Sequence, residues 1–551
     1  MGVKRMKMKR GAMALALALL LLLSGCGKTK MDYSGAYPLS KSGEAVLSDA
    51  YFAKAARSED NYRVFYEIFV GSFSDSDGDG TGDLRGIINR LNYLNDGQPA
   101  NGMSLGVEGL WLSPVFPSGS YHKYDVNDYY SVDPAFGSVD DLKELVELCH
   151  KRGVKVILDL PINHTGQLCS WYGQFVKAHR DGNTADPYYD FYCWYGPGDT
   201  APAGRRFEPI TGTQDFYECN FSNEMPELNF DSDAVRQAVL DVAEYWLDLG
   251  VDGFRFDAAK YIYLGENQRS AEFWQWYVGE LKALNPDVYT VGEVWDSDGV
   301  TDVYYSAMNC FDFTTSQAEG LIAMTAKKGN VNTYTAYVDR YLDTVQAINP
   351  DAMIVPFIAN HDTDRAAGYL TVASGHMKMA ANLYLLSSGS PFIYYGEELG
   401  MRGSRGGANT DANRRLAMLW GDDDTVRDPQ GTTYDAENQL KETVRDQLGD
   451  GGSLLSYYKK LIAIRLANPE IARGDYTALR LPDTKVGGFL STWNGSTVCV
   501  IHNTTISTAE LDVSAVTGQE FKTLAAVIGM EDAELNGTTL RIGGQTSVVL
   551  R

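Results

Sequence analysis

The sequence has few of the residues that bind zinc or build disulfide frameworks. Histidine and cysteine each occur seven times in 551 residues, and no CxxC motif is present. Zinc sites use clusters of these ligands at short spacings, so we expect no zinc site. Cys169, Cys193 and Cys219 lie close together in the sequence, and an oxidising compartment would allow one disulfide among them.

Positive charge is also scarce. The chain has 48 Lys and Arg against 72 Asp and Glu, which gives a formal net charge of −24. Residues 1–25 contribute only basic charges, so a chain without them would be more acidic still. Such a surface repels phosphate backbones, and nucleic acid is therefore not expected as a partner.

The longest apolar run lies near the N-terminus. The basic stretch MGVKRMKMKR precedes AMALALALLLLL, which is too short and too near the start to favour a permanent span. LSGC, which ends at Cys26, resembles a bacterial lipobox, whose cysteine is lipidated after cleavage. We expect a lipoprotein signal peptide over 1–25, lipid on Cys26 and a tether over 26–58. The mature protein would be extracytoplasmic, anchored to a bacterial cell membrane at the cell surface; an ordinary signal peptide with a chance cysteine is the alternative.

An acidic, glycine-rich stretch, DSDGDGTGD, occupies residues 75–83. Oxygen donors at alternate positions, with glycines that allow a sharp turn, are typical of the start of an EF-hand loop. The bidentate glutamate required at the twelfth position is replaced by Gly86, which excludes a complete EF-hand. A shorter Ca²⁺ loop is favoured over a solvated one, because carboxylates this close repel one another without a cation. Its expected ligands are Asp75, Asp77, Asp79, the carbonyl of Thr81, and Asp83.

Eight short apolar, β-branched runs recur along the chain, separated by amphipathic helical stretches such as 138–153. They cover residues 62–70, 107–115, 154–160, 251–257, 288–294, 310–314, 353–360 and 391–396. Continuous apolar strands that alternate with helices indicate a parallel sheet covered on both faces. Eight such units predict an α/β fold, a (β/α)8 TIM barrel, with an open doubly wound sheet as the alternative.

The spacing of these runs also predicts the domain organisation. The connection after the third strand is abnormally long, so residues 163–225 are expected to form an inserted small domain. It would separate the two parts of the barrel, 59–162 and 226–470. Beyond these, alternating polarity and turn signals such as Asn494-Gly495 predict a C-terminal antiparallel β-sandwich over 471–551.

Residues that can carry chemistry stand at the ends of the expected strands, where barrel active sites lie. The stretches that end strands three, four, five and seven are DLPINH, GFRFDAAK, GEVW and ANHDTDR. Three carboxylates, Asp257, Glu293 and Asp362, are therefore expected to converge, and their mutual repulsion should raise at least one pKa. A carboxylate pair suits retaining glycoside hydrolysis, in which one acid attacks and the other donates a proton.

Seven motifs occur in the order found in a known family: GLWLSPV, DLPINH, MPELN, GFRFDAAK, GEVW, IANHD and YYGEELGM. On these motifs the chain resembles glycoside hydrolase family 13, the α-amylase family, over roughly residues 60–551. The resemblance implies that Asp257 is the nucleophile, that Glu293 is the proton donor and then the base, and that Asp362 stabilises the transition state. Arg255 would keep Asp257 ionised. The other implied substrate-binding residues are Tyr124, His122, His164, Lys260, His361 and Arg365.

Specificity and a second metal site are less strongly implied by the resemblance. In α-1,6-cleaving exo-glucosidases of the family, Asp and Val often occupy the positions of His122 and Ala258. The residues found here favour endo-acting α-1,4 hydrolysis of starch or maltodextrins. MPELN lies near the neopullulanase form, so a neopullulanase-like, cyclomaltodextrinase-like or transglycosylating enzyme is the alternative. A non-catalytic glucan-binding lipoprotein is a remote alternative.

Many family members have Lys-His after the nucleophile, and that His helps to hold a calcium. This chain has Lys260-Tyr261, which puts that site in doubt; Asn163 and Asp215 are its candidate ligands.

Overall fold

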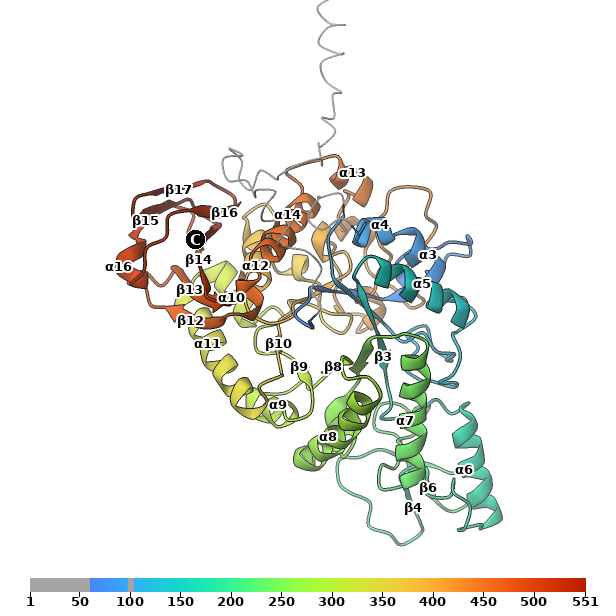
Figure 1. The fold of residues 1–551 in the computed structure, drawn as a ribbon. Coiled ribbons are helices and arrows are strands. Elements are labelled where there is room, and N and C mark those ends of the chain that lie inside the picture. Colours follow the sequence, from blue (N-terminus) through green and yellow to red (C-terminus); the bar gives the residue numbers. More distant parts are fainter. Residues whose placement is uncertain (1–59, 98–103) are drawn as a thin grey trace, which may run out of the picture.

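The computed structural model describes residues 60–97 and 104–551 (Figure 1). The predicted signal peptide, the lipid site at Cys26 and the tether lie outside these residues. Within the described part, no helix combines the length and the apolar character that a membrane span requires.

Eight parallel strands form one sheet in the order β10-β9-β8-β7-β3-β2-β1-β11. Their bounds are β1 Phe65–Ile68, β2 Gly109–Leu112, β3 Lys155–Leu160, β7 Gly253–Phe256, β8 Tyr289–Gly292, β9 Asn309–Phe311, β10 Ile354–Val355 and β11 Phe392–Tyr394. A parallel bridge between Phe357 and Phe392 joins the two edges. Each of the eight expected runs overlaps one of these strands, so the predicted barrel is confirmed.

Apolar side chains fill the barrel and cover its outside. The interior holds stacked aromatic rings, including Phe65 and Phe392 with centroids 4.6 Å apart. The helices are α3 Leu84–Asn89, α4 Leu91–Leu94, α5 Val139–Lys151, α6 Ser170–Asp181, α7 Asp233–Asp248, α8 Asn267–Leu284, α9 Asp298–Tyr304, α10 Leu321–Lys328, α11 Val331–Ile348, α12 His376–Leu385, α13 Val444–Leu448, α14 Leu454–Ala467, α15 Glu470–Arg473 and α16 Val513–Thr517. Helix α5 shows why they form: Ser138 and Asp141 make a capping box, and its buried face is apolar.

The long connection after β3 carries α6 and a small antiparallel sheet of β4 (Trp194–Tyr195), β6 (Phe216–Glu218) and β5 (Phe207–Pro209). The disulfide that the sequence allowed among Cys169, Cys193 and Cys219 is not formed in the structure, where all three are free thiols. The local structure gives the thiols separate surroundings. Cys169 lies at the start of α6, whereas the Cys193 thiol donates to the carbonyl of Leu228 at 3.5 Å.

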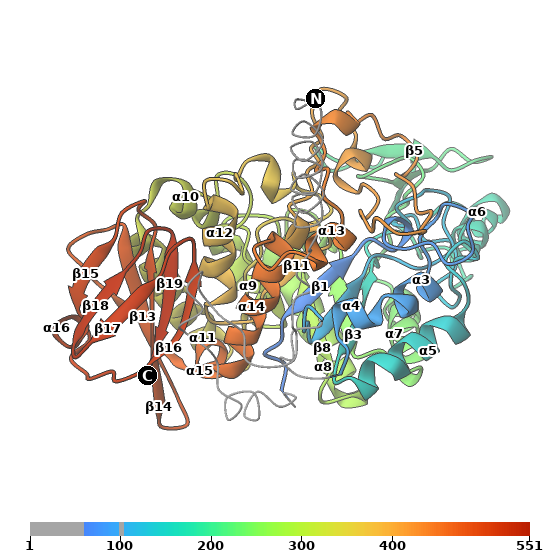
Figure 2. The ribbon, with the colours of Figure 1, turned by 90° about the horizontal axis from the view of Figure 1, so that it is seen from above.

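The C-terminal part consists of two antiparallel sheets, ordered β12-β13-β14-β19-β16 and β15-β18-β17. The strands are β12 Asp475–Leu479, β13 Val486–Trp493, β14 Ser496–Asn503, β15 Ala509–Asp512, β16 Leu524–Gly529, β17 Ala533–Asn536, β18 Thr539–Ile542 and β19 Thr546–Leu550. Asn494 and Gly495, both at positive φ, form the predicted tight turn between β13 and β14. These sheets lie on one side of the barrel and α6 on the other (Figure 2).

The connection after β11 is also long. Between Tyr395 and Ser453 it contains only short helices: η4 Glu397–Leu399, η5 Asp411–Arg414, η6 Ala436–Asn438 and α13. The sequence patterns did not indicate this excursion, which brings further side chains to the carboxyl ends of the strands.

Candidate active site

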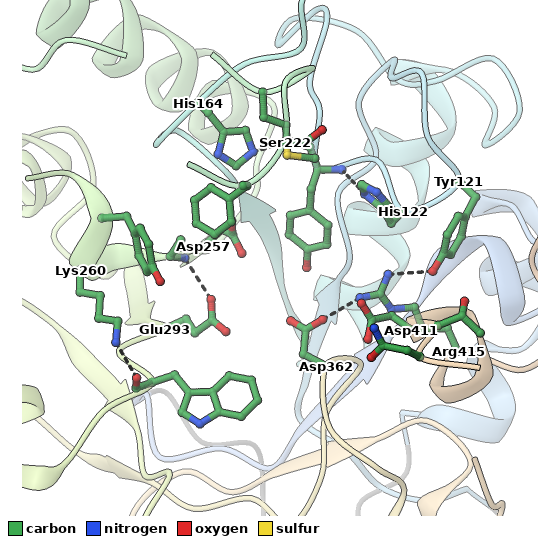
Figure 3. A pocket seen from close by; sticks show the side chains of 18 residues that line it. Tyr121, His122, His164, Ser222, Asp257, Lys260, Glu293, Asp362, Asp411 and Arg415 are labelled. Atoms are coloured by element: carbon green, nitrogen blue, oxygen red, sulfur yellow. Dashed lines mark hydrogen bonds and ion pairs between the residues drawn. The ribbon is translucent and has the colours of Figure 1, made fainter. Parts of the chain in front are cut away.

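An open pocket of about 870 Å³ lies at the carboxyl ends of the barrel strands (Figure 3). Asp257 and Glu293 directly follow β7 and β8, and Asp362 follows β10 a few residues on. All three line the pocket, as do four of the predicted substrate-binding residues: His122, Tyr124, His164 and Lys260. The convergence expected from the strand ends is therefore present in the structure.

Arg255, in β7, lies beneath these carboxylates and is fully buried. Its Nη1 lies 2.7 Å from Asp257 Oδ1 and 2.9 Å from Asp159 Oδ1, and its Nη2 lies 3.0 Å from Glu293 Oε2. The backbone N–H of Ala258 also donates to Glu293, at 3.0 Å. One guanidinium thus pairs with three carboxylates. It fixes Asp257, the candidate nucleophile, relative to Glu293, the candidate acid.

Burial and charge act in opposite directions on these acids. Burial raises the pKa of Asp257 and of Glu293, while the positive charge of Arg255 pulls both pKa values down; the net shift is upward. Burial raises the pKa of Asp159 to about 7, although the positive charge of Arg255 acts to lower it. An acid with a raised pKa is suited to donate a proton near neutral pH, as Glu293 would have to do.

Asp362 has the opposite balance. Burial would raise its pKa, but His361 and Arg415 hold the pKa well below its usual range. His361 Nδ1 lies 2.6 Å from Glu67 Oε1, and its Nε2 lies 3.1 Å from Asp362 Oδ2. Burial lowers the pKa of His361, yet Asp362 and Glu67 outweigh that effect and raise it to about 10. Asp362 is therefore held as an anion beside a cationic imidazole.

Tyr124 lies next to this pair. Its ring stacks on His361 with centroids 5.6 Å apart, and its hydroxyl lies 2.6 Å from His361 Nε2 and donates to Asp159 at 2.9 Å. His164 contacts the carbonyl of Tyr124 through Nε2 at 3.2 Å, and burial lowers its pKa to about 4. His122 likewise has its pKa lowered to about 4, by burial and Arg415. Both imidazoles are thus neutral near neutral pH, as hydroxyl-binding groups can be.

Three predicted binding residues lie below the pocket and do not line it. Arg255 and His361 are fully buried and contact the carboxylates. The predicted substrate contact of Arg365 is not supported by its position. Its side chain is buried and donates to the carbonyls of Tyr395 and Arg414, at 2.6 and 2.9 Å. These bonds attach the connection after β11 to the segment that follows β10.

Arg415 is a site residue that the sequence analysis missed. Its Nη2 lies 2.6 Å from Asp362 Oδ1, its Nη1 donates to the Tyr121 hydroxyl at 3.1 Å, and its Nε donates to the carbonyl of His361 at 3.1 Å. It comes from the long connection after β11, 53 residues beyond Asp362, and no local motif marks it. Tyr121, Arg415 and Asp411 lie on one side of the carboxylates and Lys260 on the other (Figure 3).

Aromatic walls of the pocket were missed as well. Trp295 and Phe221 line the pocket and are 41% and 43% exposed. Trp295 stacks on Phe313 with centroids 4.9 Å apart, and Phe221 contacts Tyr261 at 4.8 Å. Trp295 lies inside the GEVW motif, so its nearness to Glu293 could have indicated it. Flat exposed rings in a carboxylate pocket can pack against sugar rings.

The acidic loop brings three of its predicted ligands together. Carboxylate oxygens of Asp75, Asp77 and Asp83 lie within 4.8 Å of one another, and Asp79 is not part of this group. The Asp75 carboxylate accepts bonds from the amides of Gly78 and Gly80, at 2.7 and 2.8 Å. Three converging carboxylates with fixed orientation are a donor set that fits a hard cation such as Ca²⁺.

The candidate ligands of the second metal site bond to different partners. The Asn163 amide donates to Glu227, whereas Asp215 pairs with His179 at 2.9 Å inside the inserted segment.

Comparisons with known proteins agree with this geometry. Residues 67–474 match the family model described as Alpha amylase, catalytic domain. Alpha-amylase 3 of Dictyoglomus thermophilum is 33% identical, over 80% of this chain and 84% of that protein. The structure of Eubacterium rectale Amy13B superposes with a TM-score of 0.81 at 34% identity, covering 90% of this chain and 96% of that one. The structure of an α-amylase from H. orenii superposes with a TM-score of 0.77 at 34% identity, covering 89% of this chain and 99% of that one. The chain belongs to the α-amylase family, glycoside hydrolase family 13, and is a glycoside hydrolase.

Proposed function

We propose that this protein cleaves α-1,4-glucosidic bonds within starch or maltodextrins and retains the anomeric configuration. The observation that carries the proposal is the pair Asp257 and Glu293, bound to neighbouring nitrogens of one buried guanidinium at the floor of an open pocket. Neighbouring nitrogens keep the two carboxylates close. Retaining enzymes need a short separation, about 5–5.5 Å, whereas inverting enzymes leave room for a water.

The proposed reaction has two steps. Asp257 attacks the anomeric carbon and forms a glycosyl ester, while Glu293 protonates the departing sugar oxygen. Glu293, now a carboxylate, then takes a proton from water, which attacks the same carbon and releases Asp257. Asp362, held ionised by His361 and Arg415, supplies negative charge where the sugar ring becomes cationic.

The anomer formed first tests the retaining route. Proton NMR at early times of maltoheptaose hydrolysis should show the α-anomer at the new reducing end. An initial β-anomer would exclude the double displacement.

The product profile tests the bond and the mode of attack. We expect maltoheptaose and starch to be cut internally, with pullulan and cyclodextrins degraded much more slowly. The second candidate is a cyclodextrin-degrading or glucan-transferring enzyme, because curated relatives include a cyclomaltodextrinase of Thermoanaerobacter pseudethanolicus. Preferred attack on cyclodextrin, or products longer than the substrate, would favour that candidate.

Asp257→Asn tests the nucleophile. The change keeps the side-chain shape but removes the attacking anion, so turnover should fall by at least about a thousandfold while the thermal melt is kept. Asp181→Asn, on the exposed side of α6, is the matched control. Turnover near the wild-type value in Asp257→Asn would rule out the assigned mechanism.

We also propose a structural Ca²⁺ in the acidic loop and a lipid anchor at Cys26. The support for the ion is the converging oxygens of Asp75, Asp77 and Asp83. The support for the anchor is the LSGC sequence after a basic and then an apolar stretch. The protein would then act on α-glucans outside the bacterial cytoplasm, attached to a membrane.

A further inference from the structure

One wall of the active-site pocket is a short loop that has a closed base. Phe221, Ser222 and Met225 lie on this loop and line the pocket. At the base, the N–H of Glu227 donates to the carbonyl of Glu218 at 2.9 Å. The N–H of Asn220 donates to the Glu227 carboxylate at 3.0 Å. The position of the wall therefore depends on how Glu218 and Glu227 are held.

Both glutamates of the base are buried. Glu227 accepts a bond from the Asn163 amide and forms an antiparallel bridge with His164, next to the end of β3. This side of the base is thereby attached to the barrel. Glu218 accepts a bond from the Asn220 side-chain amide at 2.7 Å, within the loop, and from Arg205 at 3.0 Å, outside it.

Arg205 joins the segment inserted after β3 to the barrel part. Its Nη1 lies 3.0 and 3.2 Å from the two oxygens of Glu218, and its Nη2 donates to the carbonyl of Leu264 at 2.9 Å. Leu264 lies in the barrel part, just before α8. A cavity of about 310 Å³ borders Arg205, Glu218 and Glu227, so close packing cannot replace these bonds on that side.

We propose that Arg205 is a positioning residue. It holds the base of the Glu218–Glu227 loop against the barrel and thereby sets where Phe221 and Met225 meet the substrate chain. Arg205 does not line the pocket and touches no catalytic carboxylate. The inference rests on the proposed function in one respect, that the occupant of the pocket is an α-glucan.

The floor of the pocket is held independently of Arg205. His164 is fixed by the Tyr129 hydroxyl, which donates to its carbonyl at 3.0 Å, and by its own contact with Tyr124. Asp257 and Glu293 depend on Arg255. Loss of Arg205 should therefore weaken the binding of a long substrate and leave the chemical step unchanged.

The test compares Arg205→Met with Arg206→Met. Arg206 is the neighbouring residue, and its side chain forms an exposed ion pair with Glu208 at 3.4 Å. With maltoheptaose we expect Arg205→Met to raise KM about fivefold to tenfold with kcat nearly unchanged. Arg206→Met should behave as wild type. Arg205→Lys keeps the charge but not the forked geometry, and should be intermediate.

Hydrogen exchange measured by mass spectrometry gives a readout that needs no substrate. Amides between 216 and 230 should exchange faster in Arg205→Met, and those of β7 and β8 should not. This result stands even if the enzyme prefers another glucan. Unchanged exchange in that segment, or a fall in kcat at constant KM, would overturn the proposal. If Arg205→Met does not fold, wild-type exchange and wild-type KM in Arg205→Lys would overturn it as well.

Discussion

At the scale of single residues, the charges around each carboxylate separate three chemically similar acids into different roles. Asp257 is buried and Glu293 partly buried, and the desolvation of both outweighs the one guanidinium that they share, so their pKa values remain raised. Asp362 has a cationic histidine and its own arginine, so its pKa is lowered. The expected roles of nucleophile, proton donor and permanent anion follow from these surroundings.

The pH dependence of kcat/KM should be bell-shaped. On the acid side, activity falls as Asp257 takes up a proton. On the alkaline side, activity falls as Glu293 loses the proton that it must donate. Because both pKa values are raised, the acid limb should lie above the ordinary aspartate value of 3.8 and the alkaline limb above the ordinary glutamate value of 4.5. Asp362 stays ionised across this range and adds no limb. Initial rates on maltoheptaose across pH measure this, and an acid limb below 3.8 would contradict it.

Arg415→Met should lower kcat/KM by about a hundredfold, because it removes a charged partner from Asp362. The pKa of Asp362 should then rise, so the loss should be larger at acidic than at neutral pH. Arg402→Met, on an exposed part of the same connection, serves as the control. A loss that is equal at every pH would show that the Arg415 charge does not govern Asp362.

Which site residues could be predicted depends on how far their partners lie along the chain. Asp257 and Glu293 stand at the carboxyl ends of apolar runs, so the barrel rule places them at the pocket. Arg365 also follows such a run, but its direction depends on carbonyls from another connection, at Tyr395 and Arg414. Arg415 belongs to a segment without hydrophobic periodicity. Its place is set by tertiary contacts that no local pattern encodes.

At the scale of elements, the acidic loop is coupled to two neighbours. Asp83 accepts a bond from the Gly86 amide and so caps α3, and the Thr425 hydroxyl donates to Asp75 at 2.5 Å. A cation held by this loop would thus support both a barrel helix and the connection after β11. Loss of the cation should lower the stability of the fold and leave the chemistry unchanged, since none of these contacts reaches the catalytic acids.

Removal of calcium with EDTA should lower the melting temperature by about 2–4 °C, because the ion binds only the folded loop and the unfolding entropy of a chain this long is large. Asp77→Asn should abolish the response to EDTA, since Asp77 is an exposed member of the converging group. Asp79→Asn is the matched control outside that group and should keep the response. An unchanged wild-type melt in EDTA, with no metal found by elemental analysis, would mean that the loop is simply solvated.

The elements themselves were predictable to different degrees. The eight barrel strands are short continuous apolar runs, which a parallel sheet buried on both faces requires. The segment Tyr395–Ser453 has no comparable pattern, because contacts with the rest of the barrel fix its path; Gly403, for example, accepts a bond from the Arg365 amide. The possible disulfide was inferred from sequence proximity alone, and the three cysteines are free thiols in the structure.

At the scale of the whole molecule, the strong negative charge bears on how the protein could stay at a membrane. Bacterial membrane surfaces are anionic, and a chain of net charge −24 gains nothing from them electrostatically. Attachment would have to come from buried lipid chains, at about 0.8 kcal/mol per CH₂.

Cys26→Ala should therefore move the protein from the membrane fraction to the soluble fraction of a bacterial host. The measurement is immunodetection after sedimentation of membranes. Cys193→Ala removes a thiol from the folded part and should leave the distribution unchanged. Retention of Cys26→Ala in the membrane fraction would argue against lipid at that position.

The shared guanidinium of Arg255 means that the catalytic acids cannot be studied one at a time. The same guanidinium pairs with Asp159, Asp257 and Glu293. When one of these acids is neutralised, the other two lose a repelling negative charge and keep the attraction of the guanidinium. A proton bound by one acid should thus lower the proton affinity of its neighbours, and single substitutions should shift the titration of residues that were not changed. The acid and alkaline limits assigned to Asp257 and Glu293 are thus apparent pKa values, which the other acids of the cluster help to set.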